Sequence, residues 1–266
     1  MQIQTLIPYL LSSLFLLIYV ALGFLLQLET IAYLLLGVPL TLLFQVLVVK
    51  QPLRKLWLHE NDEFHLNALG WLITACFLVF PVYQLIQSVS HNTLTVVNLG
   101  FYTAVMLGAF GAGYCYSNFT KKTARDFLLC FGITAALRMS LYFFPILFGK
   151  DEFHPAYMRA IKSLLTYIPF AFVVEEVVFR GMLDSYLHSS KKGLGLGSAF
   201  FVSVLWGLWH LPLAYNGEKA IWLVAAGSIL IALWGIVLSI FWRRSGNLAV
   251  PGFSHALADT IRDGLK

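Results

Sequence analysis

The sequence predicts an all-α fold, a polytopic transmembrane helical bundle of about eight spans followed by a C-terminal helix. Of the 266 residues, 59% are hydrophobic and only 12% are charged, whereas a soluble domain has roughly 25% charged residues. The apolar residues form repeated runs of roughly 20, the length at which a helix crosses a bilayer. The runs lack the short alternating strands of a barrel, and backbone groups in lipid must be satisfied internally, so each run is expected to be helical.

Eight apolar runs give the expected spans. They cover residues 5–26, 29–49, 66–87, 94–116, 127–148, 163–181, 195–215 and 220–242. A shorter and more polar segment at 247–265 is expected to be a helix that is only partly inserted. We divide the chain into N-terminal transmembrane helices at 1–150 and core helices at 151–266, which together form one integrated membrane domain.

Basic residues gather in alternate loops between these runs. The positive-inside rule places the enriched loops, and with them the N-terminus, in the cytoplasm. In a soluble protein the net charge of +5 would raise nucleic acid as a partner. Here the same charge determines orientation, so we expect a lipid bilayer and no nucleic acid. The clusters are Lys50, Arg54 and Lys55; Lys121, Lys122 and Arg125; Lys191 and Lys192; Arg243 and Arg244.

The stretch AFVVEEVVFRG, residues 171–181, holds two carboxylates and a guanidinium in an otherwise apolar run. On a helix Glu176 and Arg180 are four residues apart and can pair on one face. Glu175 lies about 100° away and has no partner in its own helix. A carboxylate in this position suits a general base or acid. The alternative is that all three residues form structural ion pairs between helices.

The run SVLWGLWHLP, residues 203–212, contains one histidine. Trp206 is one turn earlier than His210, so the indole and the imidazole can stack on one face. Pro212 is expected to end or kink the helix just after His210. A histidine alone in such a helix is more often a packing residue than a catalyst.

The last polar segment is PGFSHALADT, residues 251–260. His255 and Asp259 are four residues apart and project from one face, and Pro251 and Ser254 fit a helix start nearby. By itself this pattern is also that of an amphipathic helix with a solvated face.

Together these segments place two glutamates, two histidines and an aspartate in the second half of the chain. A charge at the bilayer centre costs about 3 kcal/mol, so such residues usually face the bundle interior and mark a site. We therefore expect them to converge on one buried polar cavity. Arg138, in the fifth run, has no assigned role; it is expected either to pair with a carboxylate in the bundle or to extend towards the interface.

Three motifs in these segments resemble a known family. EEVVFR matches EExxxR, WGLWH matches an aromatic-xxx-His motif, and HALAD matches Hxxx(N/D). In order and spacing they are similar to the CAAX protease and bacteriocin-processing family, also called the ABI or type II CAAX prenyl endopeptidase family. The resemblance covers roughly residues 160–262, and the N-terminal spans match only in being apolar.

The resemblance implies an intramembrane glutamate-dependent endopeptidase without a cofactor. Glu175 would activate the attacking water with help from His210, and His255 and Asp259 would stabilise the oxyanion. Asp259 stands where some members have asparagine; an ionised aspartate cannot donate a hydrogen bond, so it would instead orient His255 or act while protonated. Supporting positions would be held by Glu176, Arg180 and Trp206.

The same resemblance implies a peptide or protein substrate at the membrane. The expected location is the inner (plasma) membrane of a bacterium, with several spans and a cytoplasmic N-terminus. The sequence determines neither the substrate, including whether it is prenylated, nor the oligomeric state.

Three other interpretations remain open at this stage. Zinc takes nitrogen and oxygen ligands, and the four candidate catalytic residues could supply them, although the chain has no HExxH motif. The protein could be a membrane immunity factor or a scaffold without catalytic activity. A transporter or proton pathway is disfavoured because the polar residues are confined to one half of the chain.

Overall fold

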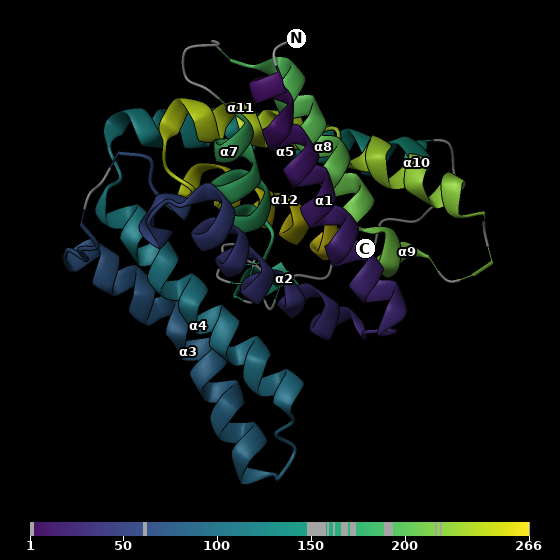
Figure 1. Ribbon diagram of the computed structural model, residues 1–266. Helices are drawn as coiled ribbons and strands as arrows, with labels where there is room; N and C mark the ends of the chain where they lie inside the picture. Colours follow the sequence, from purple (N-terminus) through teal and green to yellow (C-terminus); the bar gives the residue numbers. More distant parts are fainter. Residues whose placement is uncertain are drawn as a thin grey trace.

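The computed structural model describes residues 3–60, 63–147, 158, 160–161, 163–165, 170, 174–188, 194–215, 217–218 and 220–265. Within these ranges every regular element is a helix. One isolated β-bridge pairs Leu58 with Asn247. The all-α prediction is therefore confirmed. Figure 1 shows a bundle of crossing helices from which one helical hairpin projects.

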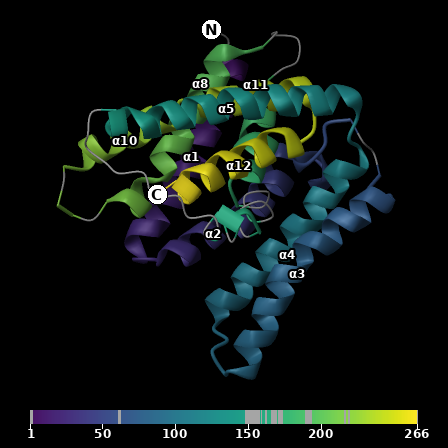
Figure 2. The ribbon, with the colours of Figure 1, turned by 180° about the vertical axis from the view of Figure 1, so that it is seen from behind.

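The projecting hairpin consists of α3 (Ala68–Ser90) and α4 (Val96–Ser117), which lie side by side in both ribbon views (Figures 1 and 2). Each helix is capped by the residue before it: the side chains of Asn67 and Thr95 accept hydrogen bonds from backbone N–H groups of the first turn. A Cβ added to Gly113 would lie 2.6 Å from the carbonyl oxygen of Gly70. The close approach of the two helices therefore requires a glycine at this position.

Around the hairpin base, α1 (Ile3–Leu25) and α2 (Thr30–Phe44) pack against the second half of the chain. Helix α2 continues into the π-helical turn η1 (Gln45–Val49), and a 3₁₀ turn, η2 (Leu53–Leu56), follows. The Tyr33 hydroxyl of α2 donates a hydrogen bond to the Trp209 carbonyl at 2.7 Å. This buried contact joins the N-terminal helices to the core.

Helix α5 (Lys121–Leu147) is the last of the N-terminal helices and runs alongside α12 (Ala249–Leu265) of the core in Figure 2. A π-helix, η3 (Val177–Asp184), leads into the short α7 (Ser185–Leu187). Helix α8 then packs against α10 and α11. The remaining bounds are α8 Leu196–Trp209, α9 Leu211–Ala214, α10 Ile221–Ala232 and α11 Gly235–Ser245.

Five segments of the described chain are long and apolar enough to cross a membrane, and a sixth is formed if α10 and α11, bent by 44°, make one span. The predicted count of eight is not confirmed. The expected span at 127–148 coincides with α5 up to Leu147, and part of the expected span at 163–181, namely 166–169 and 171–173, lies outside the described residues. The five are Leu6–Leu25, Thr30–Val49, Ala68–Ser90, Val96–Ser117 and Leu196–Ala214.

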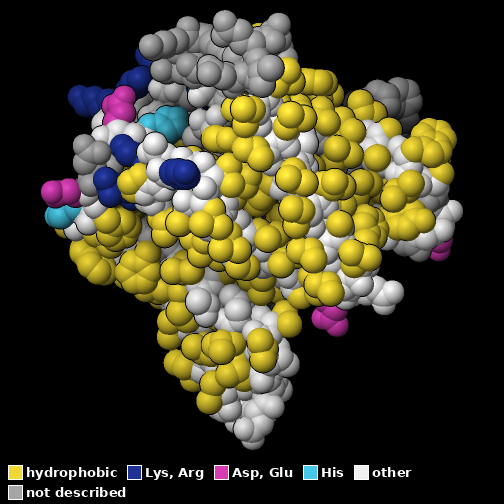
Figure 3. Space-filling view, in the orientation of Figure 1, with side chains coloured by type: hydrophobic (Ala, Val, Ile, Leu, Met, Phe, Trp, Pro, Cys, Tyr) yellow, Lys and Arg dark blue, Asp and Glu magenta, His cyan; other side chains and the backbone are white. Residues whose placement is uncertain are grey.

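The surface agrees with a membrane setting. Figure 3 shows hydrophobic side chains over most of one face, with basic groups gathered to one side. Leu10, Leu17 and Val79 are among the large apolar side chains that are more than half exposed. Such an extended apolar surface fits contact with lipid. The protein is an integral membrane protein.

Candidate active site

The EExxxR segment supplies a buried ion pair and a second carboxylate. Glu176 directly precedes η3, and Arg180 lies within it; both side chains are fully buried. Arg180 Nη1 donates to Glu176 Oε1 at 3.2 Å, so the pairing predicted from their spacing is confirmed. The same guanidinium lies 4.5 Å from the ring centre of Trp206 and donates to the Gly235 carbonyl at 3.4 Å. Arg180 is therefore held on three sides.

The partners of Glu175 come from other helices. Trp206 Nε1, on α8, donates a hydrogen bond to Glu175 Oε2 at 3.1 Å. His255 Nε2, on α12, lies 3.9 Å from the same oxygen. The Glu175 side chain is 13% exposed, whereas that of Glu176 is fully buried. The two adjacent glutamates thus enter different surroundings.

His210 ends α8, which stops at Trp209, three residues before Pro212. Pro212 lies in the first turn of α9, and the apolar segment continues through it to Ala214. His210 Nδ1 is 2.8 Å from the Trp206 carbonyl oxygen. A carbonyl only accepts, so Nδ1 carries the proton and a neutral His210 keeps a lone pair on Nε2. Its ring meets Trp206 edge to face at 5.5 Å and is not stacked on it.

Helix α12 carries the third motif. It begins at Ala249, whose N–H donates to Asn247 Oδ1, so the helix expected at 247–265 is confirmed to within two residues at its start, with Pro251 in its first turn. His255 Nδ1 lies 2.7 Å from Glu176 Oε1, and Nε2 lies 3.3 Å from Asp259 Oδ2. Both ring nitrogens face carboxylates, which matches an imidazolium donating from both.

Asp259 has a partner that sequence reasoning did not identify. Arg138 Nη2, on α5, donates to Asp259 Oδ1 at 2.7 Å. An arginine in an apolar run signals that some partner exists, and pairing with a carboxylate was one of the two outcomes expected. Only the packing of α5 against α12 shows which carboxylate it is.

A cavity of about 490 Å³ joins these groups. Its polar wall is formed by the four candidate catalytic residues together with Arg138 and Trp206, while Glu176 and Arg180 are not part of the wall. The rest of the lining is largely apolar and comes from α2, α4, α8, α9 and α10. The residues of this polar wall are Glu175, His210, His255, Asp259, Arg138 and Trp206; Thr30 and Ser228 also line the cavity, and the apolar residues include Ile31, Leu34, Phe101, Phe170, Leu213 and Trp234.

Comparison with known proteins concerns this same half of the chain. Residues 158–261 match the family model described as type II CAAX prenyl endopeptidase Rce1-like. This segment is therefore similar to Rce1-like proteins. The match includes all three motifs, which agrees with the resemblance seen in the sequence. No curated protein and no solved structure matches the chain.

In the described part of the chain, no three His, Cys, Asp or Glu side chains are grouped so as to hold a metal ion. The two His255 nitrogens lie at hydrogen-bond distance from carboxylate oxygens instead. We therefore derive no catalytic step through zinc.

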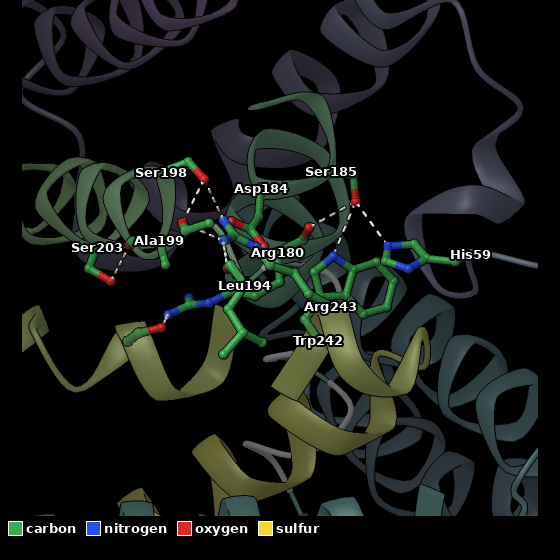
Figure 4. A network of polar contacts seen from close by, with 12 residues as sticks. His59, Arg180, Asp184, Ser185, Leu194, Ser198, Ala199, Ser203, Trp242 and Arg243 are labelled. Atoms are coloured by element: carbon green, nitrogen blue, oxygen red, sulfur yellow. Dashed lines mark hydrogen bonds and ion pairs between the residues drawn. The ribbon is translucent and has the colours of Figure 1, made fainter. Parts of the chain in front are cut away.

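A second polar network lies at the other end of η3 (Figure 4). Arg243 pairs with both oxygens of Asp184 and donates to the carbonyls of Leu194 and Gly195 and to Ser198 Oγ. The Arg243 side chain is only 3% exposed. It was expected to be a loop residue that determines orientation, but it lies in the last turn of α11 and is buried.

Ser185 extends this second network. Trp242 Nε1 donates to Ser185 Oγ at 3.1 Å, and His59 Nε2 lies 3.4 Å from the same oxygen (Figure 4). Burial lowers the pKa of His59 to about 4, so this imidazole is neutral at physiological pH.

Proposed function

We propose that the protein is an intramembrane glutamate-dependent endopeptidase that hydrolyses a peptide bond near the membrane. The match to the Rce1-like family model supports peptidase activity in general terms. The observation that carries the specific proposal is the shared cavity, where Glu175, His210 and His255 line one space of about 490 Å³. This volume is within the range of pockets that accept a small ligand or a few residues of peptide.

In the first step, a water molecule between Glu175 and His210 loses a proton to the Glu175 carboxylate. The new O–C bond forms at the scissile carbonyl carbon, and the carbonyl π electrons move to its oxygen. His210 Nε2 can accept a hydrogen bond from this water, because Nδ1 is committed to the Trp206 carbonyl. A base placed in this way contributes about 10²- to 10⁴-fold to the rate.

In the second step, the tetrahedral intermediate collapses. The C–N bond breaks, and the leaving amine takes the proton from Glu175, which regenerates the carboxylate. His255 lines the cavity, and its Nε2–H, which lies 3.3 Å from Asp259 Oδ2, can also donate a hydrogen bond to the oxyanion. Asp259 accepts hydrogen bonds from His255 and Arg138, which favours the orienting role for it over the donor role.

The supporting residues hold this arrangement in place. Glu176 binds Nδ1 of His255, and Arg180 binds Glu176. Trp206 donates to Glu175 and lies against both histidine rings. Because these contacts hold the catalytic side chains in position, the groups need little reorganisation during the reaction.

We extend the proposal to the setting of the enzyme. Residues 151–266 form the catalytic core and residues 1–150 the N-terminal transmembrane helices of one integrated domain. The protein lies in the inner membrane of a bacterium with its N-terminus in the cytoplasm, and its partners are lipid and a peptide or protein substrate. A cysteine-accessibility assay on either side of the membrane, with single cysteines placed in the 50–60 and 90–95 loops, tests this orientation.

The activity is tested with purified protein in lipid nanodiscs and a peptide library, with and without a chelator. The wild type is expected to cleave some peptides regardless of chelator, and the isosteric Glu175→Gln variant to cleave none at a measurable rate. The matched control is Asp126→Asn, since Asp126 pairs with Arg244 outside the cavity. Full biological activity of Glu175→Gln in cells would reject the protease and favour a scaffold.

A further inference from the structure

Arg138 brings a positive charge into the cavity from outside the three motifs. It lies on α5, in the half of the chain that the Rce1-like match does not cover. Its side chain is 16% exposed and lines the same cavity as Glu175 and His210. A charged side chain in an apolar helix that reaches a cavity is by default a functional candidate.

The contacts of Asp259 show that this residue cannot itself donate a hydrogen bond to a substrate in the cavity. Its Oδ1 accepts from Arg138 and its Oδ2 faces His255 Nε2. A carboxylate that accepts on both oxygens carries no proton to donate. Where an asparagine amide would offer N–H groups to the cavity, this chain has an acceptor with an arginine attached to it.

Arg138 is well placed to supply those N–H groups. Among the described residues, its guanidinium makes one hydrogen bond, from Nη2 to Asp259. N–H groups remain on both terminal nitrogens, since guanidinium has five donors. The guanidinium lies 5.7 Å from the ring centre of Trp234, and this ring meets His255 at 5.1 Å. The Asp259 bond and the Trp234 ring therefore hold it beside His255.

The charge balance of the cluster points the same way. Glu175, Glu176 and Asp259 face Arg180 and His255, and these five groups alone leave an excess of negative charge even with an imidazolium at position 255. Arg138 cancels that excess. A site that must stabilise a further negative charge on the substrate gains from this compensation, because Coulomb interactions are strong in a water-poor cavity.

We propose that Arg138 is a further catalytic residue, whose guanidinium, anchored by Asp259, donates a hydrogen bond to the scissile carbonyl oxygen as it becomes the oxyanion. Arg138 and His255 would then approach that oxygen from adjacent sides. This inference rests on the proposed peptidase function and assigns a further donor within it. It also gives Asp259 a definite role, the positioning of both donors.

The test uses the full-length protein in nanodiscs and the fluorogenic peptide that the wild type cleaves fastest in the library. The variants are Arg138→Gln, Arg138→Lys and the double variant Arg138→Gln with Asp259→Asn. Arg244→Gln is the matched control, because Arg244 also pairs with a buried aspartate but lies outside this cavity. For each variant, kcat, KM and the melting temperature are measured.

Removing one oxyanion donor costs about 10²- to 10³-fold in kcat, and this is the loss expected for Arg138→Gln, with KM changed by less than about threefold. Arg138→Lys keeps the charge but loses the planar fork, so kcat is expected to fall at least about 10-fold with little change in melting temperature. In the double variant the asparagine amide can donate to the oxyanion itself. We expect it to recover at least about 10-fold of the kcat lost in Arg138→Gln.

The inference is overturned if Arg138→Gln keeps wild-type kcat, or if its effect is confined to KM. It is also overturned if Arg138→Lys, in which an ion pair to Asp259 is still possible, cleaves at the wild-type rate. Glu175→Gln separates this failure from that of the proposed function. An inactive Glu175→Gln beside a fully active Arg138→Gln rejects the role of Arg138 alone, whereas a wild type that cleaves no peptide removes the basis for both.

Discussion

Two polar networks lie at opposite ends of the same π-helix, η3. At its N-terminal end the carboxylates of Glu175 and Asp259 and the rings of His210 and His255 line a cavity. At its C-terminal end Arg243 is enclosed by Asp184, two carbonyls and a serine hydroxyl. Both networks contain a buried arginine and a buried carboxylate, and both border a cavity, since Arg243 and His59 line one of about 410 Å³. They differ in their carboxylates: Glu175 and Asp259 line the first cavity, whereas Asp184 is not among the residues that line the second. Ionisable residues in an apolar chain thus serve two purposes, and whether the carboxylates line a cavity tells them apart.

The largest expected effect comes from Glu175→Gln, which removes the proposed base without changing the shape of the side chain. We expect kcat to fall by about 10³-fold or more, near the upper end of what a general base supplies. The melting temperature should stay close to that of the wild type, since Glu175 lines the cavity and its side chain is not fully buried. Peptide cleavage and thermal unfolding of the same preparation check both parts. A large drop in melting temperature would mean that Glu175 is structural.

Arg243→Met should show the opposite pattern. Breaking one partner of a buried ion pair costs about 3–5 kcal/mol of stability, because Asp184 is left charged and without its partner. We expect a strongly destabilised protein whose remaining folded fraction keeps its specific activity. Unfolding is measured in detergent, and activity is normalised to the folded fraction.

The double variant Asp184→Leu with Arg243→Met provides the control for that prediction. Apolar replacement of a whole buried pair is often close to neutral, so part of the lost stability should return. If neither the single nor the double variant changes the melting temperature, the Asp184–Arg243 network does not stabilise the fold, and the two networks do not differ in purpose.

Trp206→Phe should have a smaller effect, and on activity alone. Phenylalanine keeps an aromatic ring between the histidines but cannot donate to Glu175. A hydrogen bond to a charged group contributes about 1.5–3 kcal/mol, so kcat is expected to fall by about 10-fold or somewhat more. Steady-state kinetics with the library peptide measures this. An unchanged kcat would show that Glu175 does not depend on the indole for its position.

The smallest effect is expected for Tyr33→Phe, which belongs to neither network. Its hydroxyl donates to the Trp209 carbonyl and joins α2 to α8. Losing one such bond costs about 1 kcal/mol, and the cleavage rate should not change. A shift in melting temperature of a few degrees would confirm the estimate, while a loss of activity would show that the N-terminal helices position the site more directly.

The helical class and the Glu176–Arg180 pair were predictable because both depend on short-range patterns. Apolar runs of membrane length specify helices, and the spacing of Glu176 and Arg180 specified their pairing. The number of spans was less predictable: α10 and α11 are bent relative to each other, and an apolar run does not reveal where a helix breaks. The helix expected at 247–265 begins at Ala249, but Ser254 is no cap: it lies inside the helix, where its hydroxyl donates to the Val250 carbonyl.

The sequence by itself determined that the chain is a helical membrane protein, that its second half carries three polar motifs, and that Glu175 has no partner within its own helix. The tertiary structure alone decided that Trp206 binds Glu175, that Glu176 binds His255 and that Arg138 reaches Asp259. The physical reason is the range of the interactions. Spacing along one helix determines which side chains share a face, but contacts between helices depend on how whole helices pack, and no local pattern records that packing.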